Sequence, residues 1–371
     1  MKKLTIALHF YIGRKSPHNN KGTICAPMTL LEDIASRLHK KGHKVFFINS
    51  KDSKNKPYYY KTPLFNHTVD HPEIKKLNDA NKQKEKAKLV AEFNNMVVEE
   101  FLEKHGSKID IFHSHKIEYS LGGMHSQQES FASVFTHHDP VSKAHNVWTK
   151  KAKNKLSNPH FTYLSKNHSK TATTKNKHIL YNGINPKLYP FSKTADDFLA
   201  FSGRMVKEKN PLVALKIAKE LNKPIKLAGI ATKGDKYWEK QIKPLLSKER
   251  TYLGLLPYDK MYTLYQKARA LLFPIQWEEP FGLVMVEAMA CGTPVIAFKR
   301  GSVPEIIKHG KTGFIVNNQQ EMIKATKKLY SMPEKEYTAM RNNCRKHVEK
   351  NFSVEKMVKD YEKLYYKIVK I

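Results

Sequence analysis

Short apolar runs of strand length alternate with stretches of helical periodicity along the first half of the chain. Met28 to Lys41 repeats apolar residues at helical spacing and is stopped by Gly42, which predicts an amphipathic helix between two strands. Lys51 to Pro72 is predicted as a surface excursion, and Glu73 to His105 as one long helical stretch. The predicted strands are Leu4 to Ile12, Lys44 to Asn49, Ile109 to Phe112, Val134 to Thr136, His160 to Leu164 and His178 to Tyr181. Apolar strands separated by helices are typical of a parallel α/β sheet.

The second half repeats this pattern after a predicted linker, Pro186 to Asp197, which holds two prolines. A helix is predicted from Pro211 to Leu221, and a last amphipathic helix follows Ser353 as its cap. The strands predicted here are Phe198 to Ser202, Ile225 to Ile230, Leu271 to Ile275 and Pro294 to Phe298. Because 371 residues exceed one ordinary core, two α/β domains of similar size are expected.

One stretch of the second half combines apolar pattern with chemistry. After the strand ending at Ile275, Pro280 suits the first turn of a helix that Cys291 and Gly292 end. The helix start leaves three backbone N–H groups without partners, and its glycine has no side chain to keep a ligand away. These groups belong to Phe281, Gly282 and Leu283. The pattern predicts an anion site.

Two acids, Glu279 and Glu287, flank the same helix start. A carboxylate does not bind phosphate, so both are interpreted as acceptors for hydroxyl groups on either side of a bound diphosphate. Hydroxyl groups on both sides of a diphosphate describe a nucleotide sugar. The alternative is that Glu279 complements the helix dipole and that Glu287 is a solvated helix residue.

A cationic turn follows the strand that ends at Ser202. Gly203 opens it, and Arg204 and Lys209 are spaced to clamp a diphosphate, Arg by planar bidentate contact and Lys as a point charge. Lys207 is the nearest competitor to Lys209, unless it is a solvated loop lysine. Gly229 ends the next strand, where a base or ribose has room to approach.

Histidines cluster at the ends of two strands of the first half. His113 and His115 follow one strand, and His137 and His138 follow the next. In α/β sheets this is where substrates bind. A metal site is disfavoured because no HExxH or comparable ligand spacing occurs. For His113 and His115, hydrogen-bonded structural histidines are an equally good interpretation.

Several of these motifs together resemble one known family. EEPFGLVMVEAMACGTPVIAF carries an E-x7-E signature, GRMVKEK a GR-x4-K arrangement, THHD a T-x-H-D pattern and NGI a turn near the domain junction. This combination is similar to retaining glycosyltransferases of family 4. The resemblance implies the GT-B fold: α/β, with two Rossmann-like doubly wound domains facing across a cleft and a C-terminal helix crossing back to the first domain. The expected domains are an acceptor-side domain over 1–190, a nucleotide-sugar-binding domain over 191–350 and the crossover helix over 351–371.

The resemblance also implies roles for residues. The expected catalytic residues are His138, Glu279, Arg204 and Lys209. Glu279 would lie at the transferred sugar, Glu287 at the ribose hydroxyls, and His138 would approach the sugar from the other domain, with His137 in that role if the alignment slips by one residue. The expected donor-binding residues are Gly203, Arg204, Lys209, Gly229, Glu279, Phe281, Gly282, Leu283 and Glu287. The expected acceptor-side residues are Gly22, His113 and His137. No metal and no cofactor are expected besides the nucleotide-diphosphate sugar, which is a substrate.

Composition limits the partners. The formal charge is +32, carried by 58 Lys and only eight Arg, which is typical of a solvated surface, although an anionic membrane surface stays open as a partner. Nucleic acid is not expected, because zinc spacings and RRM-type motifs are absent. Cys25, Cys291 and Cys344 form no CxxC pair, which favours a reducing cytoplasm. The expected location is cytoplasmic, with peripheral attachment at an inner membrane face left open. The two lysines before Leu4 are read as preceding a buried strand and not a signal peptide.

The functional hypothesis is therefore transfer of a hexosyl-type group from a nucleotide-diphosphate sugar to an unidentified acceptor, with retention of anomeric configuration. One alternative is a nucleotide-sugar epimerase or hydrolase on the same fold. Another is a basic, non-enzymatic protein that binds membranes or nucleic acid.

Overall fold

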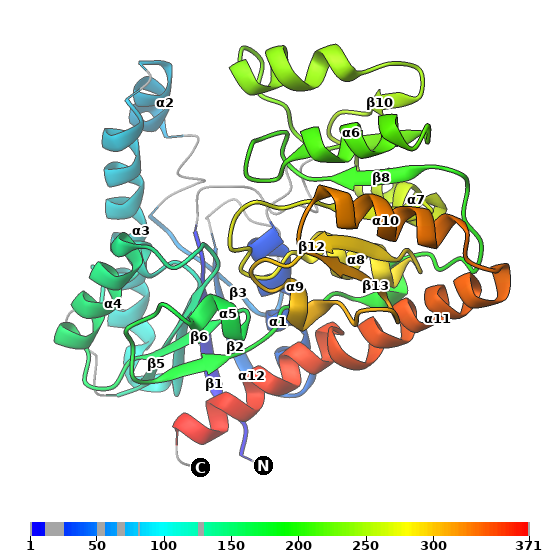
Figure 1. The fold of residues 1–371 in the computed structure, drawn as a ribbon. Coiled ribbons are helices and arrows are strands. Elements are labelled where there is room, and N and C mark those ends of the chain that lie inside the picture. Colours follow the sequence, from blue (N-terminus) through cyan, green and yellow to red (C-terminus); the bar gives the residue numbers. More distant parts are fainter. Residues whose placement is uncertain are drawn as a thin grey trace. The chain divides into compact units, whose positions relative to one another are not determined.

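The computed structural model describes residues 2–11, 26–49, 56–64, 71–80, 82–124 and 130–369. Contacts within the chain divide it into two compact units (Figure 1). Unit 1 comprises Met1–Leu164, Ser169–Leu180 and Met357–Ile371, and unit 2 comprises Ser165–His168 and Tyr181–Lys356. The boundary expected at residue 190 therefore lies inside unit 2. The candidate residue Gly22 lies outside the described residues.

Unit 1 is built on a seven-stranded parallel sheet in the order β3-β2-β1-β4-β5-β6-β7. Its strands are β1 (Thr5–His9), β2 (Lys44–Asn49), β3 (Tyr59–Lys61), β4 (Ile111–Ser114), β5 (Ala132–His137), β6 (His160–Tyr163) and β7 (Lys177–Ile179). Its helices are α1 (Ala26–Lys40), α2 (Pro72–Asp79), α3 (Gln83–His105) and α4 (Lys143–Lys155). The sequence order reverses between β1 and β4, which makes the sheet doubly wound.

Unit 2 is built on a six-stranded parallel sheet in the order β10-β9-β8-β11-β12-β13. Its strands are β8 (Leu199–Ser202), β9 (Ile225–Ala228), β10 (Arg250–Tyr252), β11 (Ala270–Phe273), β12 (Val295–Phe298) and β13 (Gly313–Val316). Its helices are α6 (Pro211–Glu220), α7 (Tyr258–Lys267), α8 (Leu283–Ala290), α9 (Val303–Ile306), α10 (Gln319–Tyr330) and α11 (Glu334–Asn351). α6 and α10 pack on each other, and α8 packs on α7 and α11. All residues of β8 and β11 are buried, which is why both read as continuous apolar runs.

The predicted fold class of two Rossmann-like domains is confirmed. Two local predictions were wrong. The segment predicted as a surface excursion, 51–72, contains the edge strand β3. Two of the three residues of β3 are tyrosines, which are favoured in strands. The single long helix ends at Asp79 and restarts at Gln83, and the sequence at the break contains Asn and Asp, residue types of low helix propensity.

The last helix, α12 (Val354–Ile368), begins in unit 2 and continues into unit 1, as predicted. Ser353 Oγ accepts the Lys356 N–H at 3.4 Å, which caps the helix start. Within unit 1, Tyr361 and Tyr365 of α12 are buried, and the hydroxyl of Tyr365 lies 2.6 Å from Nδ1 of His113. α12 is therefore part of the unit 1 core.

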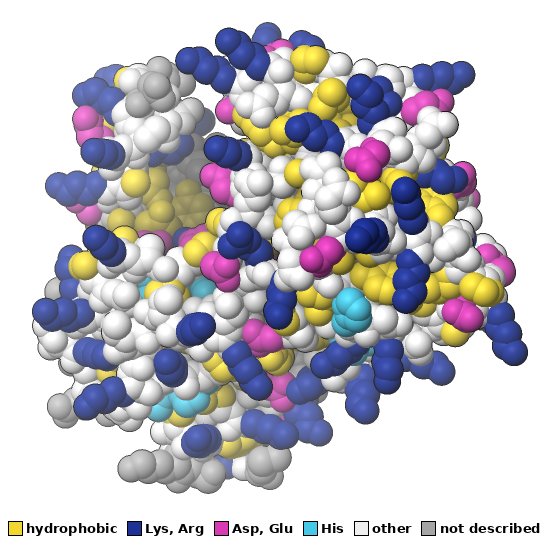
Figure 2. Space-filling model, in the orientation of Figure 1, with side chains coloured by type: hydrophobic (Ala, Val, Ile, Leu, Met, Phe, Trp, Pro, Cys, Tyr) yellow, Lys and Arg dark blue, Asp and Glu magenta, His cyan; other side chains and the backbone are white. Residues whose placement is uncertain are grey.

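Within the described ranges, no helix combines the length and the apolar character needed to cross a bilayer. Figure 2 shows Lys and Arg side chains over much of the visible face, with Asp and Glu scattered among them. This distribution reflects the formal charge of +32.

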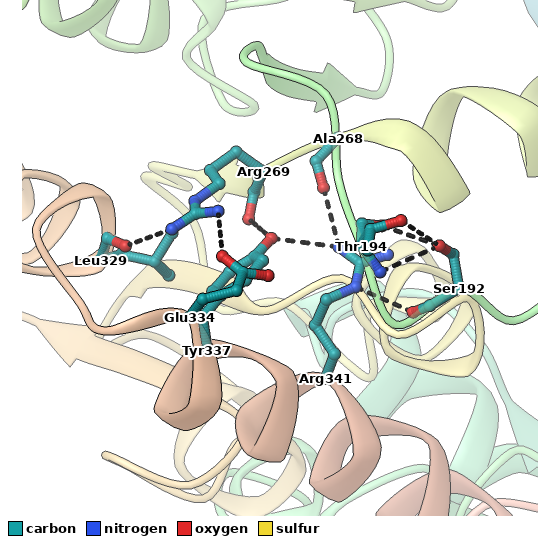
Figure 3. A network of polar contacts seen from close by, with 8 residues as sticks. All are labelled: Ser192, Thr194, Ala268, Arg269, Leu329, Glu334, Tyr337 and Arg341. Atoms are coloured by element: carbon teal, nitrogen blue, oxygen red, sulfur yellow. Dashed lines mark hydrogen bonds and ion pairs between the residues drawn. The ribbon is translucent and has the colours of Figure 1, made fainter.

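Arginine is used differently from lysine in unit 2. Arg341 on α11 is fully buried without a carboxylate partner (Figure 3). Its guanidinium donates to the carbonyl oxygens of Ser192 at 2.9 Å, Ala268 at 3.1 Å and Gln266 at 2.7 Å. Tyr337 in turn donates to the Arg269 carbonyl at 2.8 Å. One planar cation thus ties the segment after residue 189 to the end of α7, because only a guanidinium offers five donors in a fixed plane.

Candidate functional site

The polar candidates of unit 2 gather where its strand order reverses, between β8 and β11. Ligands of doubly wound sheets bind at such switch points, outside the carboxyl ends of the strands. Two loops meet here, residues 203–210 after β8 and residues 274–282 after β11. The Gln276 N–H donates to the Glu208 carbonyl at 2.9 Å, and Asn210 Nδ2 donates to the Pro274 carbonyl at 3.0 Å. These bonds hold the loops together.

Lys209 and Glu279 come together across the two loops. Nζ of Lys209 donates to Oε2 of Glu279, and the indole Nε1 of Trp277 donates to the same oxygen at 2.8 Å. The Lys209 ammonium also lies 4.5 Å from the centre of the Trp277 ring, a cation–π contact. Oε1 of Glu279 has no partner among the described residues and is available to accept another hydrogen bond. The sequence singled out Lys209 and Glu279, which the structure brings together, but it did not indicate Trp277.

Arg204 lies on the same loop and is exposed. Its guanidinium has no hydrogen-bond or ion-pair partner among the residues that the structure describes. The loop around it is fixed, because the Met205 N–H donates to the Ile230 carbonyl at 2.8 Å and the Lys209 N–H to the Val206 carbonyl at 3.1 Å. Lys207 is also exposed. The loop therefore presents a positioned guanidinium that is ready to bind an anion.

The start of α8 needs glycine. Gly282 has a φ of 78°, and a Cβ there would lie 2.6 Å from Cε of Met285 and 3.3 Å from Cγ of Glu279. The N–H groups of Phe281, Gly282 and Leu283 have no acceptor among the described residues, as expected at a helix start. The Phe281 side chain is buried against the rings of Tyr181 and Phe352, so only its backbone is suited to a ligand.

Glu287 is partly buried beside tyrosines rather than solvated. The Tyr265 hydroxyl lies 3.3 Å from its Oε2, and Tyr189 and Tyr262 are close enough to interact with its charge. Burial raises the pKa of Glu287 from 4.5 to about 7, although hydrogen bonds from Tyr265 and Tyr189 oppose the shift. Glu287 therefore titrates near neutral pH, and the interpretation as a solvated helix residue is excluded.

Gly203 and Gly229 are in close contact at the ends of β8 and β9. A Cβ on Gly229, whose φ is 140°, would lie 1.9 Å from the Gly203 carbonyl oxygen. Two large apolar side chains follow on the same edge, Ile230 with 50% and Leu253 with 37% of its surface exposed. Sequence reasoning missed both, because nothing in the pattern distinguishes an exposed isoleucine from a buried one. Flat apolar contact of this kind suits a nucleotide base.

The histidines of unit 1 lie at its own switch point, beside β1, β4 and β5. His113 is fully buried, and its Nδ1 and Nε2 lie 2.6 Å from the Tyr365 hydroxyl and 2.7 Å from Thr136 Oγ1. Burial lowers its pKa to about 3. Both ring nitrogens are therefore occupied inside the core, which favours the structural interpretation of His113 over an acceptor contact.

His138 is only partly buried, at the end of β5. Its Nε2 lies 2.8 Å from Nδ1 of the buried His115, and burial lowers the pKa of His115 well below its usual range. One of the two facing nitrogens must carry the proton, so His115 fixes the orientation of the His138 ring. His137 instead faces His145, with ring centres 3.7 Å apart. Among the described residues no three His, Cys, Asp or Glu side chains are grouped as metal ligands.

Glu305 is a second residue whose contacts the sequence did not indicate. Its carboxylate accepts the N–H groups of Lys166 at 2.8 Å and Asn167 at 2.9 Å, and the Tyr181 hydroxyl at 2.8 Å. These partners lie more than 120 residues away along the chain, so no local pattern reports them. Glu305 is a structural anchor within unit 2.

Residues 190–347 match the family model described as glycosyl transferases group 1. N-acetyl-alpha-D-glucosaminyl L-malate synthase of Bacillus anthracis is 35% identical over 101 residues, which are 27% of this chain and 26% of that protein. This match therefore spans about a quarter of that relative's length. The match to a second curated relative, the glycosyltransferase MJ1178 of Methanocaldococcus jannaschii, spans about half of that protein. The predicted resemblance to glycosyltransferases is thus confirmed for this segment, whereas family 4 stays a prediction.

Two solved structures share the fold over essentially the whole chain. Sucrose-phosphate synthase from Thermosynechococcus elongatus superposes with a TM-score of 0.76 and 19% identity, covering 99% of both chains. Anabaena HepE in complex with UDP and glucose superposes with a TM-score of 0.71 and 16% identity, covering 98% of this chain and 100% of that chain. These likenesses confirm the fold of the two units.

Proposed function

We propose that the protein transfers a hexosyl-type group from a nucleotide-diphosphate sugar to an acceptor hydroxyl, as a retaining glycosyltransferase similar to family 4. The observation that carries the proposal is the meeting of Lys209 and Glu279 at the β8/β11 switch point, on loops that also carry Arg204, whose guanidinium has no partner among the described residues. A cation pair suits the diphosphate, and a carboxylate beside it suits sugar hydroxyls. The match of residues 190–347 to group 1 glycosyl transferases supports this assignment.

In the proposed reaction, the bond between the sugar C1 and the diphosphate oxygen breaks, and its electron pair goes to the diphosphate. The acceptor hydroxyl oxygen forms the new bond to C1, and its proton goes to the departing diphosphate. Arg204, Lys209 and the free N–H groups at Gly282 would stabilise this negative charge without a metal. Oε1 of Glu279 would accept a hydroxyl of the transferred sugar while Trp277 and Lys209 hold Oε2. Glu287 would accept the ribose hydroxyls, and the apolar surface of Ile230 and Leu253 would contact the base.

The proposed role of unit 1 is to supply the acceptor side. His138, with its ring oriented by His115, is proposed to contact the transferred sugar. The proposed retention of anomeric configuration rests on the resemblance to family 4. No metal or further cofactor is part of the proposal. The buried, unpaired Cys291 and Cys344 support a cytoplasmic location.

The first test is thermal unfolding with UDP-, GDP- and ADP-sugars, on the wild type and on Arg204→Ala. UDP-glucose is the first donor to try, since a HepE structure was solved with it. A ligand at about 100 times its dissociation constant adds about 2.7 kcal/mol to the stability of the folded state. We expect one nucleotide class to raise the melting temperature of the wild type and to lose most of that effect in Arg204→Ala. No response to any nucleotide sugar at millimolar concentration would reject the donor site.

Product analysis separates the proposal from its enzymatic alternative. An epimerase or hydrolase would convert the donor in the absence of any acceptor, whereas a transferase needs one. A basic, non-enzymatic binding protein would show no nucleotide response at all, and its ligand binding would survive Arg204→Ala and Glu287→Ala.

A further inference from the structure

An unusually basic segment begins after β5 in unit 1 and continues into unit 2. Residues 140–195 contain eleven Lys and no Asp, Glu or Arg. Its only long helix is α4, which carries five of these lysines. Among the described helices of eight residues or more, α4 alone has basic residues and no acidic one. The positive charge of this segment is therefore not balanced locally, as it is on the other helices.

The helix presents its lysines on one side. His145, Thr149 and Ala152 are buried, and the residues that alternate with them at helical spacing face outward. The outward side consists of the exposed Lys143, Lys150 and Lys151 around Val147. Val147 exposes 52% of its surface, so a bare apolar side chain lies one turn from each of these three lysines.

A neighbouring loop extends this surface. Lys153 Nζ donates to the Thr173 carbonyl at 3.1 Å, and Thr173 Oγ1 donates to Asn146 Oδ1 at 3.4 Å. The loop thus lies beside α4 and brings two more exposed lysines. We name the lysine face by its six members, Lys143, Lys150, Lys151, Lys153, Lys170 and Lys175. None of the six is ion-paired with a carboxylate in the described part of the chain.

We propose that the lysine face docks the protein on a lipid bilayer that contains anionic lipids. Charge complementarity supplies the attraction, since each Lys near such a surface strengthens binding about fivefold. Val147 would enter the headgroup region between the lysines, and the partly exposed Trp148 flanks it with the Lys151 ammonium 4.5 Å from its ring centre. Lysines around a small apolar and aromatic centre are typical of helices that lie in a membrane interface.

The composition of the face argues against nucleic acid as the partner. The chain has no Arg between Arg37 and Arg204, whereas bidentate Arg contacts dominate the reading of bases and phosphates. The lysine face also offers no row of exposed aromatic rings on which bases stack. Binding to a lipid bilayer needs neither bidentate Arg contacts nor a row of stacked aromatic rings.

The docking proposal goes beyond glycosyl transfer and does not depend on it. It does have a consequence for acceptor access, because α4 begins five residues after His138 in the sequence. A protein held by the lysine face would keep this end of β5 close to molecules anchored in the same bilayer.

The test uses the full chain and co-sedimentation with vesicles of phosphatidylcholine, with and without phosphatidylglycerol. The test variant is Lys143→Gln, Lys150→Gln, Lys151→Gln combined. The matched control removes the same charge from α10 in unit 2, where Lys324, Lys327 and Lys328 are exposed and replaced by Gln. Thermal unfolding of both variants checks that they fold.

We expect the wild type to bind only phosphatidylglycerol vesicles and to dissociate at high salt. The test variant should bind at least tenfold more weakly, and the α10 control within about threefold of the wild type, because three lysines at about fivefold each give roughly a hundredfold. Val147→Ser should weaken binding while leaving its salt dependence unchanged. If both triple variants lost vesicle affinity equally, net charge alone would explain binding, and the proposal would be overturned.

Two other outcomes would also overturn it. Vesicle binding that survives in the test variant would show that the lysine face is not used. Retention of the wild type on an RNA homopolymer, lost in the test variant while vesicle binding persists, would assign the face to nucleic acid.

Discussion

Glu287→Gln is expected to stabilise unit 2 above neutral pH and to weaken donor binding. The substitution keeps the shape of the side chain and the hydrogen bond with Tyr265, and it removes the charge. In the folded protein burial raises the pKa of this carboxyl from 4.5 to about 7. Because the folded-state pKa is raised, the ionised form destabilises the fold fully above about pH 7. The penalty disappears as the pH falls toward 4.5.

The expected size follows from the shift. At about 1.36 kcal/mol per pH unit, the stability of Glu287→Gln relative to the wild type should rise by roughly 2–3 kcal/mol between about pH 5 and pH 8. For a unit of this size that is about 5–10 °C in melting temperature. The assay is thermal unfolding of both proteins across this pH range. Taking the difference cancels the contributions of all other titrating groups.

A matched control is Glu220→Gln, because Glu220 is exposed at the end of α6. It removes the same charge from an exposed position, and the pH-dependent difference of Glu287→Gln is judged against it. The reasoning is refuted if the Glu287→Gln difference is flat or falls as the pH rises. In the presence of a responding nucleotide sugar the order should reverse, with Glu287→Gln gaining less from the ligand, since a neutral amide accepts ribose hydroxyls more weakly than a carboxylate.

Three further predictions test other parts of the structure. Arg341→Met should cost unit 2 about 3–5 kcal/mol in urea unfolding, because several buried carbonyls lose their donor, whereas the exposed Arg300→Met should cost less than about 1 kcal/mol. Trp277→Phe keeps an aromatic ring but removes the indole N–H that holds Glu279, so kcat of transfer should fall about 10-fold to 100-fold with a smaller change in donor affinity, measured by steady-state kinetics. Burial lowers the pKa of His113 to about 3, so unit 1 should lose on the order of 2 kcal/mol from this residue between pH 6.5 and pH 5; hydrogen exchange in β4 should show this loss in the wild type and not in His113→Gln.

The fold could be predicted because its determinants are local. Strands such as β8 and β11 are buried on both faces and therefore read as uninterrupted apolar runs. The short edge strand β3 was missed because it has only three residues, none of them fully buried. The donor-side candidates could be named from the sequence for a related reason, since Glu279, Gly282 and Glu287 belong to one continuous segment.

Side-chain environments were not predictable in the same way. His113 and His138 lie at the ends of neighbouring strands, and the apolar pattern alone does not show which of the two is buried. Their environments differ because Tyr365, 252 residues away, closes over His113. The same holds for Glu287, whose pKa depends on tyrosines from other segments. Contacts made across the fold decide which of two similar residues is available to a ligand.

Most arginines of the protein have structural partners. The described part of the chain has seven Arg, and six of them have hydrogen-bond or ion-pair partners: Arg37, Arg250, Arg269, Arg300, Arg341 and Arg345. Arg204 alone is exposed without one. In a chain that otherwise places mostly Lys on its surface, the Arg204 guanidinium, on the same loop as Lys209, has no structural task in unit 2.

The conservative substitution of Arg204 separates charge from geometry: Arg204→Lys keeps the charge and loses the planar bidentate contact. If the site binds a diphosphate, Arg204→Lys should recover only part of the nucleotide affinity that Arg204→Ala loses, and full recovery would show that net charge alone attracts the ligand.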